Sequence, residues 1–203
     1  MKRILVILGV CLVVPPVTTT AAQGDSGSER AALERYLAGM SWPLRAATGR
    51  AQRVHDAIRG AVSPGDPPFL GMVAESCRKL RDVENVGRAR GVGAILRAVP
   101  PRALAATHRA LVRTYVDVRA GCNRARVVAL AARRALEDLG PNPTEQELSR
   151  ATKAALEELV RFDRTKLRPF KQAVRVWRVA VQQDAEAVGL EPPDWIGRLQ
   201  LAP

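Results

Sequence analysis

The chain has 203 residues, with 32 Lys and Arg against 20 Asp and Glu, and a formal net charge of +12. This length suits one domain with a sizeable core, and the charge favours anionic partners. Aromatic residues make up 4% of the sequence, which argues against a β-sandwich, a β-barrel and an aromatic sugar-binding platform.

The N-terminal segment has the three parts of a secretory signal peptide. Lys2 and Arg3 precede an apolar run at 4–14, and small and polar residues follow at 18–22. The apolar run is shorter than the about 20 residues of a membrane-spanning helix. We therefore predict cleavage after Ala22, a secreted or otherwise extracytoplasmic location, and no transmembrane anchor after cleavage.

Four long amphipathic helices are predicted in the mature chain, because apolar residues recur every three or four positions. The predicted helices span about 27–62, 69–98, 102–138 and 144–188, and a tail covers 190–203. Pro43 predicts a kink or a brief break in the first helix, and Pro169 predicts a kink in the last. Three glycines leave 87–93 open between helix and hinge. Four aromatic residues are expected in the core: Trp42, Phe162, Phe170 and Trp177.

Short connections rich in Pro and Gly join these helices, which predicts an all-α, up-down-up-down four-helix bundle in a single domain at 23–203. Cys77 and Cys122 lie equally far along the chain from the Pro100-Pro101 pair. If a helical hairpin turns there, the two sulfur atoms face each other within disulfide range. Exported proteins keep such pairs oxidised. We therefore predict a structural disulfide between Cys77 and Cys122, with two unpaired buried thiols as the alternative.

Motifs for catalysis and for cofactors are missing from the sequence. It contains no Cys-x-x-Cys, Glu-x-x-His, His-Glu-x-x-His or Gly-x-Ser-x-Gly pattern. His108 falls on the apolar stripe of the third helix, where a buried, hydrogen-bonded histidine is expected. A ligand site near His108 and Tyr115 is the alternative, and His55 is expected at a surface edge. The sequence therefore favours a non-enzymatic protein without a cofactor.

Arginine residues gather on one face of the third helix. At 100° per residue, the face opposite its apolar stripe carries Arg102, Arg109, Arg113, Arg124 and Arg134. Basic residues also dominate 161–178, where Asp163 is the single acid. Two basic helices side by side would attract phosphate polymers or anionic lipid headgroups. An arginine-rich solvated surface that reflects a GC-rich genome is the alternative interpretation.

These patterns together predict a secreted, non-enzymatic helical-bundle protein whose basic faces contact an anionic partner. That partner would be an envelope polymer, lipid headgroups or another exported protein. Nucleic acid is disfavoured, because export removes it as a partner and no aromatic platform interleaves the arginines. The alternative function is a small-molecule or cofactor carrier, or an enzyme, with a site inside the bundle near His108.

Overall fold

The structure is a computed structural model that describes residues 26–62, 67–81 and 93–199. The predicted signal segment at 1–22 and most of the 87–93 stretch lie outside these residues. Every regular element within the described ranges is helical, in agreement with the predicted all-α class. No helix among them is long and apolar enough to cross a membrane.

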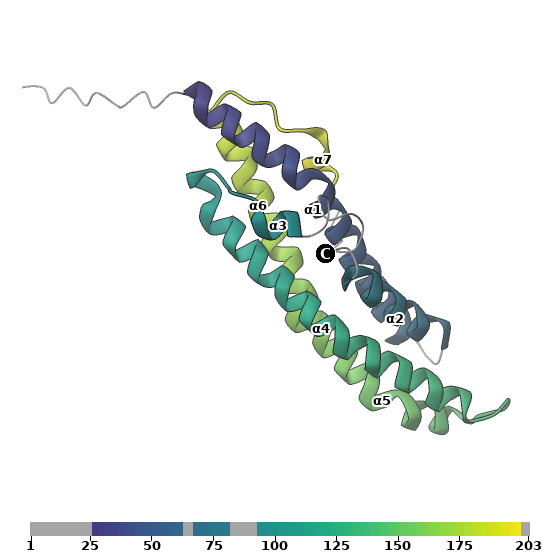
Figure 1. Ribbon diagram of the computed structural model, residues 1–203. Helices are drawn as coiled ribbons and strands as arrows, with labels where there is room; N and C mark the ends of the chain where they lie inside the picture. Colours follow the sequence, from purple (N-terminus) through teal and green to yellow (C-terminus); the bar gives the residue numbers. More distant parts are fainter. Residues whose placement is uncertain (1–25, 63–66, 82–92, 200–203) are drawn as a thin grey trace, which may run out of the picture.

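The long helices form an elongated bundle in which the chain direction alternates (Figure 1). They are α1 (Ser26–Val62), α2 (Pro67–Arg81), α4 (Ala105–Glu137), α5 (Glu145–Phe162) and α6 (Arg168–Ala187). The short helices are α3 (Gly93–Arg97) and α7 (Asp194–Gly197). α1 and α4 run in one direction, while α2 and the α5–α6 arm run in the other. The order of the four arms matches the predicted one, with α5 and α6 together as the fourth arm.

Pro43 was expected to cause a kink or a brief break; helix α1 continues through it, which excludes the break. Its buried face carries apolar residues three or four positions apart: Leu33, Leu37, Met40, Leu44, Ala47, Ala51, Val54, Ile58 and Ala61. The stripe keeps its phase across Pro43, so both halves of α1 bury the same face. Trp42 was expected in the core, but it is 42% exposed. It lies two positions, or 200°, from both Met40 and Leu44, which turns it away from the stripe.

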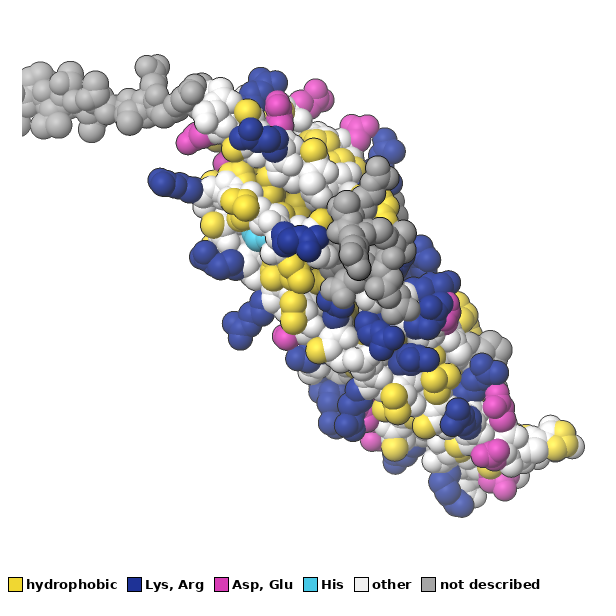
Figure 2. All heavy atoms as spheres, viewed as in Figure 1, with side chains coloured by type: hydrophobic (Ala, Val, Ile, Leu, Met, Phe, Trp, Pro, Cys, Tyr) yellow, Lys and Arg dark blue, Asp and Glu magenta, His cyan; other side chains and the backbone are white. Residues whose placement is uncertain are grey.

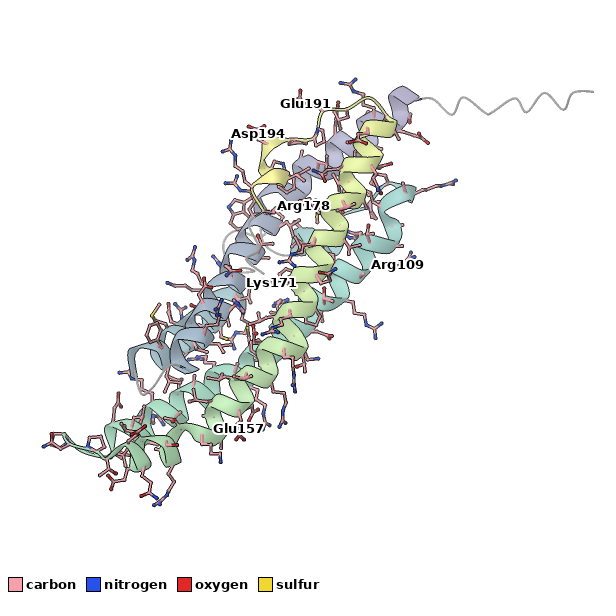
Figure 3. The ribbon with its side chains drawn as sticks, turned by 180° about the vertical axis from the view of Figure 1, so that it is seen from behind. Arg109, Glu157, Lys171, Arg178, Glu191 and Asp194 are labelled. Carbon is pink, nitrogen blue, oxygen red and sulfur yellow. The ribbon has the colours of Figure 1, made fainter. Side chains whose placement is uncertain are left out.

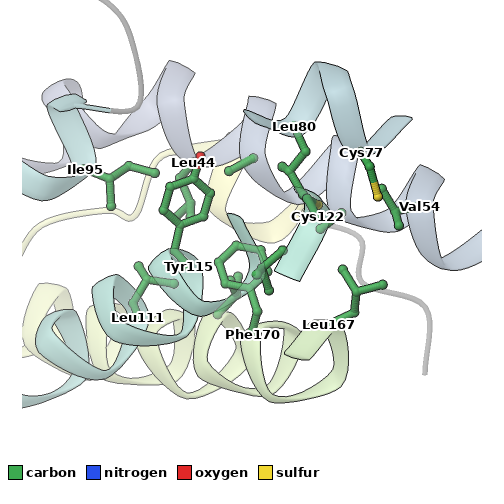
Figure 4. Close-up of a cluster of buried hydrophobic side chains, with 14 of the residues drawn as sticks. Leu44, Val54, Cys77, Leu80, Ile95, Leu111, Tyr115, Cys122, Leu167 and Phe170 are labelled. Carbon is green, nitrogen blue, oxygen red and sulfur yellow. The ribbon is translucent and has the colours of Figure 1, made fainter. Parts of the chain in front are cut away.

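Helices α2 and α4 pack against each other in an antiparallel arrangement, and α2 also packs against α1. Cys77 of α2 and Cys122 of α4 come within 3.5 Å of each other. A helical hairpin that turns midway between them would place them opposite each other in this way. Both are buried thiols in this structure and form no disulfide. Figure 4 shows them inside the apolar core, close to Val54 and Leu80. Their facing positions agree with the prediction, whereas the covalent bond between them stays a prediction.

The fourth arm is interrupted by a π-helical turn, Asp163–Leu167, which joins α5 to α6. Thr144 and Glu147 begin the arm with a capping box, in which each side chain accepts a hydrogen bond from the other residue's backbone N–H. At the far end, Gly189 adopts a φ of 63°, a left-handed conformation that suits glycine. The Leu190 N–H then donates to the carbonyl of Ala185 at 2.8 Å and closes the last turn.

The C-terminal tail folds back on the bundle. Trp195 of α7 stacks on Trp177 of α6, with ring centroids 6.1 Å apart. Ile196 and Leu199 are buried in the same core as α1 and α6. The tail therefore covers one end of the α1–α6 interface, and the middle of that interface carries the candidate site.

Candidate functional site

A cleft of about 660 Å³ opens between α1 and the fourth arm. We call it the cationic cleft, because five of its eight described lining residues are Lys or Arg. The described lining residues are His55, Arg59, Arg164, Arg168, Pro169, Lys171, Gln172 and Arg175. None of these eight is acidic, and none is a serine, threonine or cysteine that could act as a nucleophile. The lining is therefore suited to holding an anion.

The first polar group of the cleft is a histidine held by a carboxylate. His55 Nδ1 lies 2.6 Å from Asp163 Oδ1, and His55 is 3% exposed. A carboxylate can only accept, so Nδ1 carries the hydrogen that it donates to Asp163. The other ring nitrogen, Nε2, is buried and has no hydrogen-bond partner in the described structure. Asp163 thus fixes which nitrogen of His55 is left for a ligand.

The second polar group is a buried lysine. Lys171 is 4% exposed, and its Nζ atom has no hydrogen-bond partner among the described residues. Figure 3 shows it where α6 faces α1. Burial lowers the pKa of Lys171, and the nearby carboxylates of Asp163 and Asp56 oppose that shift. An ammonium group in this position has nearby carboxylates but no direct hydrogen-bonded partner among the described residues, which buried ions normally have.

The rim of the cleft is more exposed and strongly basic. Arg59, Arg164 and Arg168 are exposed to solvent, and Arg168 Nε donates to Asp163 Oδ2 at 3.1 Å. Asp163 therefore has both of its oxygen atoms engaged, one by His55 and one by Arg168. It is buried and lies behind the lining, so the cleft itself presents a positive surface to solvent.

Local sequence explains how the fourth arm supplies these groups. Pro169 has no N–H, and its ring clashes with the carbonyl four residues earlier in a regular α-helix. The π-helical turn Asp163–Leu167 inserts a wider turn immediately before it, so the helix continues into α6 with Pro169 in the first turn. A change of helix type thus accommodates Pro169, at the position where the sequence predicts a kink. Turns of this kind occur often at functional sites.

The sequence pattern identified part of this site and missed the rest. The basic run at 161–178 includes Arg164, Arg168, Lys171 and Arg175, which all line the cleft. His55 was expected at a surface edge, and that expectation was wrong, because it lies four residues after Ala51 on the buried stripe. Asp163 and Lys171 occupy stripe positions too, four residues after Leu159 and Leu167. The sequence did contain a signal for this site: polar residues stand at positions of the apolar stripes where apolar residues are expected.

The arginines predicted as the anionic contact lie elsewhere. Four of them are exposed along α4, Arg102 is exposed in the short 3₁₀ turn just before it, and none of the five lines the cationic cleft: Arg102, Arg109, Arg113, Arg124 and Arg134. They form a stripe along the helix, and Arg124 is paired with Glu158 of α5. Figure 2 shows basic side chains distributed along the length of the molecule on the face it displays. The structure therefore places these five residues on one open helix surface.

His108 belongs to a separate buried cluster, near the end of the bundle that the C-terminal tail covers. Its Nδ1 lies 2.9 Å from the hydroxyl of Tyr36, which accepts a 2.8 Å hydrogen bond from Trp177 Nε1. Burial lowers the pKa of His108 and raises that of Tyr36, so both groups are neutral at pH 7. A neighbouring cavity of about 470 Å³ is lined by Tyr36, and His108 lines neither this cavity nor the cationic cleft. The geometry of His108 is that of a hydrogen-bonded core residue.

The described residues also include no group of three or more His, Cys, Asp or Glu side chains placed to hold a metal ion. Neither protein-family models, nor curated proteins, nor solved structures give a significant match to this chain.

Proposed function

We propose that the protein is an exported, non-enzymatic helical-bundle protein that binds an anionic partner at the cationic cleft. One observation supports this most directly: five cationic side chains surround a single cleft whose described lining contains no acid. A cleft lined by one sign of charge focuses its electric field and raises the local concentration of ions of the opposite sign. An envelope polymer, lipid headgroups or an acidic surface of another exported protein would each meet this requirement.

The arginine face of α4 is the second basic surface, and it provides a matched comparison. Its residues are open to solvent and spread along a helix, so salt screens them strongly. The cleft instead brings cations from α1, the π-helical turn and α6 to one place. We therefore assign the anionic contact to the cleft, and we treat the α4 face as a weaker, additive surface.

Binding to a polyanion tests this proposal. Poly-L-glutamate and vesicles containing an anionic lipid are titrated with the protein at increasing NaCl, and binding is followed by anisotropy or sedimentation. The affinity should fall steeply with salt. The double variant Arg59→Glu, Arg164→Glu should weaken it about tenfold or more, which corresponds to about 1.4 kcal/mol.

The control carries the same change of charge on α4, Arg109→Glu with Arg134→Glu, and should have a much smaller effect. Equal weakening by the two double variants would show that binding follows net charge without using the cleft. Absence of binding to both polyanions at low salt would remove the proposed function.

Export and oxidation of the two cysteines belong to the same proposal. Its support is the signal-like pattern at 1–22 and the 3.5 Å approach of two buried thiols. A hydrogen bond with Cys77, together with burial, raises the pKa of Cys122. Forming the disulfide would require oxidation of both thiols in the exporting compartment. Mass spectrometry of the exported protein checks both points. The intact mass should correspond to a chain that begins at Gln23, and a digest made without reductant should contain a linked Cys77–Cys122 peptide.

A further inference from the structure

We propose that the floor of the cationic cleft binds a phosphate monoester group, with Lys171 Nζ and His55 Nε2 as its buried ligands. This inference rests on the proposed function and names the chemistry that the cleft recognises. Rim arginines would attract any anion, whereas the two buried nitrogen atoms would select one by its shape and charge.

The two buried nitrogen atoms at the floor of the cleft lack partners in the described structure. Nearly all buried polar atoms in folded proteins form a hydrogen bond. Here His55 Nε2 and Lys171 Nζ are both buried and unpartnered within the described structure, and both residues line the same cleft. They come from facing helices, α1 and α6. An oxyanion between them would accept a hydrogen bond from each and would give Lys171 a direct partner of opposite charge.

The charges around the cleft floor indicate what charge a ligand should carry. The carboxylate of Asp163 accepts from His55 Nδ1, so a second anion at Nε2 makes the imidazole a donor at both nitrogens, in its protonated form. Lys171, His55 and the rim arginines together then outweigh Asp163. This balance favours a ligand with more than one negative charge.

The arrangement of the donors around the cleft suits a tetrahedral anion. A phosphate monoester carries close to two negative charges at neutral pH and offers three acceptor oxygens in a compact tetrahedral group. The donors reach the cleft from α1, the π-helical turn and α6, so they approach a central anion from several directions. Arg164 and Arg168 add guanidinium groups, which match phosphate geometry well. A carboxylate has one charge and two oxygens, so it offers no third oxygen to the rim guanidinium groups once the two buried nitrogen atoms are paired.

The size of the cleft indicates that the phosphate group is attached to a larger molecule. About 660 Å³ is within the range of sites for small organic ligands. Soluble phosphomonoesters and the headgroup of a phosphatidate lipid share the required chemistry. Phenyl phosphate and phosphatidate vesicles serve as probes for the two sources.

Calorimetric titration of the protein with phenyl phosphate, inorganic phosphate and benzoate tests the inference at a constant ionic strength of about 150 mM. Phenyl phosphate should bind with a Kd below about 1 mM, at least about tenfold more tightly than benzoate. Lys171→Met should weaken phenyl phosphate binding by at least about tenfold. Lys153→Met removes the same charge from an exposed site on α5 and should leave the affinity unchanged within about twofold.

Thermal stability separates a binding role of Lys171 from a structural one. Replacing an unpartnered buried ammonium by an apolar side chain of similar length should leave the melting temperature unchanged or raise it. Phenyl phosphate should raise the melting temperature of the wild-type protein and not that of Lys171→Met. The inference is overturned if phenyl phosphate does not saturate the wild-type protein, or if Lys171→Met binds it equally well.

The two possible sources are distinguished by competition. If phenyl phosphate displaces the protein from phosphatidate vesicles, the lipid headgroup occupies the cleft. If phenyl phosphate binds and the vesicles do not, the ligand is a soluble monoester. If the wild-type protein binds the polyanions in a salt-dependent way but does not bind phenyl phosphate, this inference alone is overturned. The proposed function would then stand.

Discussion

The two histidines of this chain are both buried, yet their partners give them different roles. Tyr36 engages Nδ1 of His108, within a cluster that also holds Trp177 and receives the stacked ring of Trp195. His55 has a carboxylate on one side and a cleft on the other, with Nε2 unpartnered in the described structure. Both histidines thus lie on the apolar stripe of their helix. They differ in the partner that the facing helix supplies, and this partner makes His108 a core residue and His55 a candidate ligand.

The burial of His108 predicts a pH-dependent stability. Its pKa in the folded protein is lowered from the usual 6.5, so below that pH the unfolded chain binds more protons than the folded one. The free energy of unfolding should therefore fall as the pH drops below about 6.5, by at most about 1.4 kcal/mol per pH unit from this group. Urea unfolding at several pH values between 7.5 and 5 measures the slope.

The matched variant for this prediction is His108→Gln, which keeps an acceptor for the Tyr36 hydroxyl. The difference in stability between the wild-type protein and the variant should change across this pH range, whereas other titrating groups cancel in the comparison. A constant difference from pH 7.5 to 5 would show that His108 does not gain a proton on unfolding, contrary to its burial in the structure.

At the scale of elements, the contact between α4 and α5 depends on a glycine. A Cβ atom placed on Gly121 would lie 2.5 Å from Cε2 and 2.8 Å from Cδ2 of Phe162, whose ring is buried. Gly121→Ala should therefore destabilise the protein by about 1–2 kcal/mol, the cost of overpacking less the gain in helix propensity. Urea unfolding of the variant measures the effect.

Gly39→Ala is the control for that prediction. Gly39 lies inside α1, and no atom is found within 4 Å of its would-be Cβ. This change should stabilise the protein by about 0.5–1 kcal/mol, because alanine favours the helix and has a less flexible unfolded state. If Gly121→Ala were as stabilising as Gly39→Ala, α4 and α5 would not approach as closely as the structure shows.

Periodicity predicted the helices well, because burial of one face is a local property of the sequence. It could not predict the π-helical turn before Pro169, since a proline inside an apolar stripe is compatible with a kink, a break or a wider turn. It also could not pair His55 with Asp163, which are 108 positions apart. Such a pair depends on which helices face each other and on their relative rotation. Cys77 and Cys122 are the exception, because they lie equally far along the chain from Pro100-Pro101. That symmetry indicated which two helices face each other, and it predicted the α2–α4 pairing.

At the scale of the whole molecule, the basic surface divides into two parts with different physical properties. The exposed arginines of α4 act over distances of a Debye length and are weakened by salt. The buried nitrogens of His55 and Lys171 act at contact distance, where water and salt screen them little. A ligand that carries a phosphate group on a charged polymer or membrane would use both parts, the first for attraction and the second for recognition.

The proposed disulfide would join the α2 arm to the α4 arm across a chain segment of about 45 residues. Closing a loop of that length restricts the unfolded chain and should stabilise the oxidised protein by up to about 4 kcal/mol. Urea unfolding with and without reductant measures this contribution, which should be absent from the double variant Cys77→Ala, Cys122→Ala. Identical unfolding curves with and without reductant would contradict the disulfide and leave the hydrogen-bonded thiols as the native state.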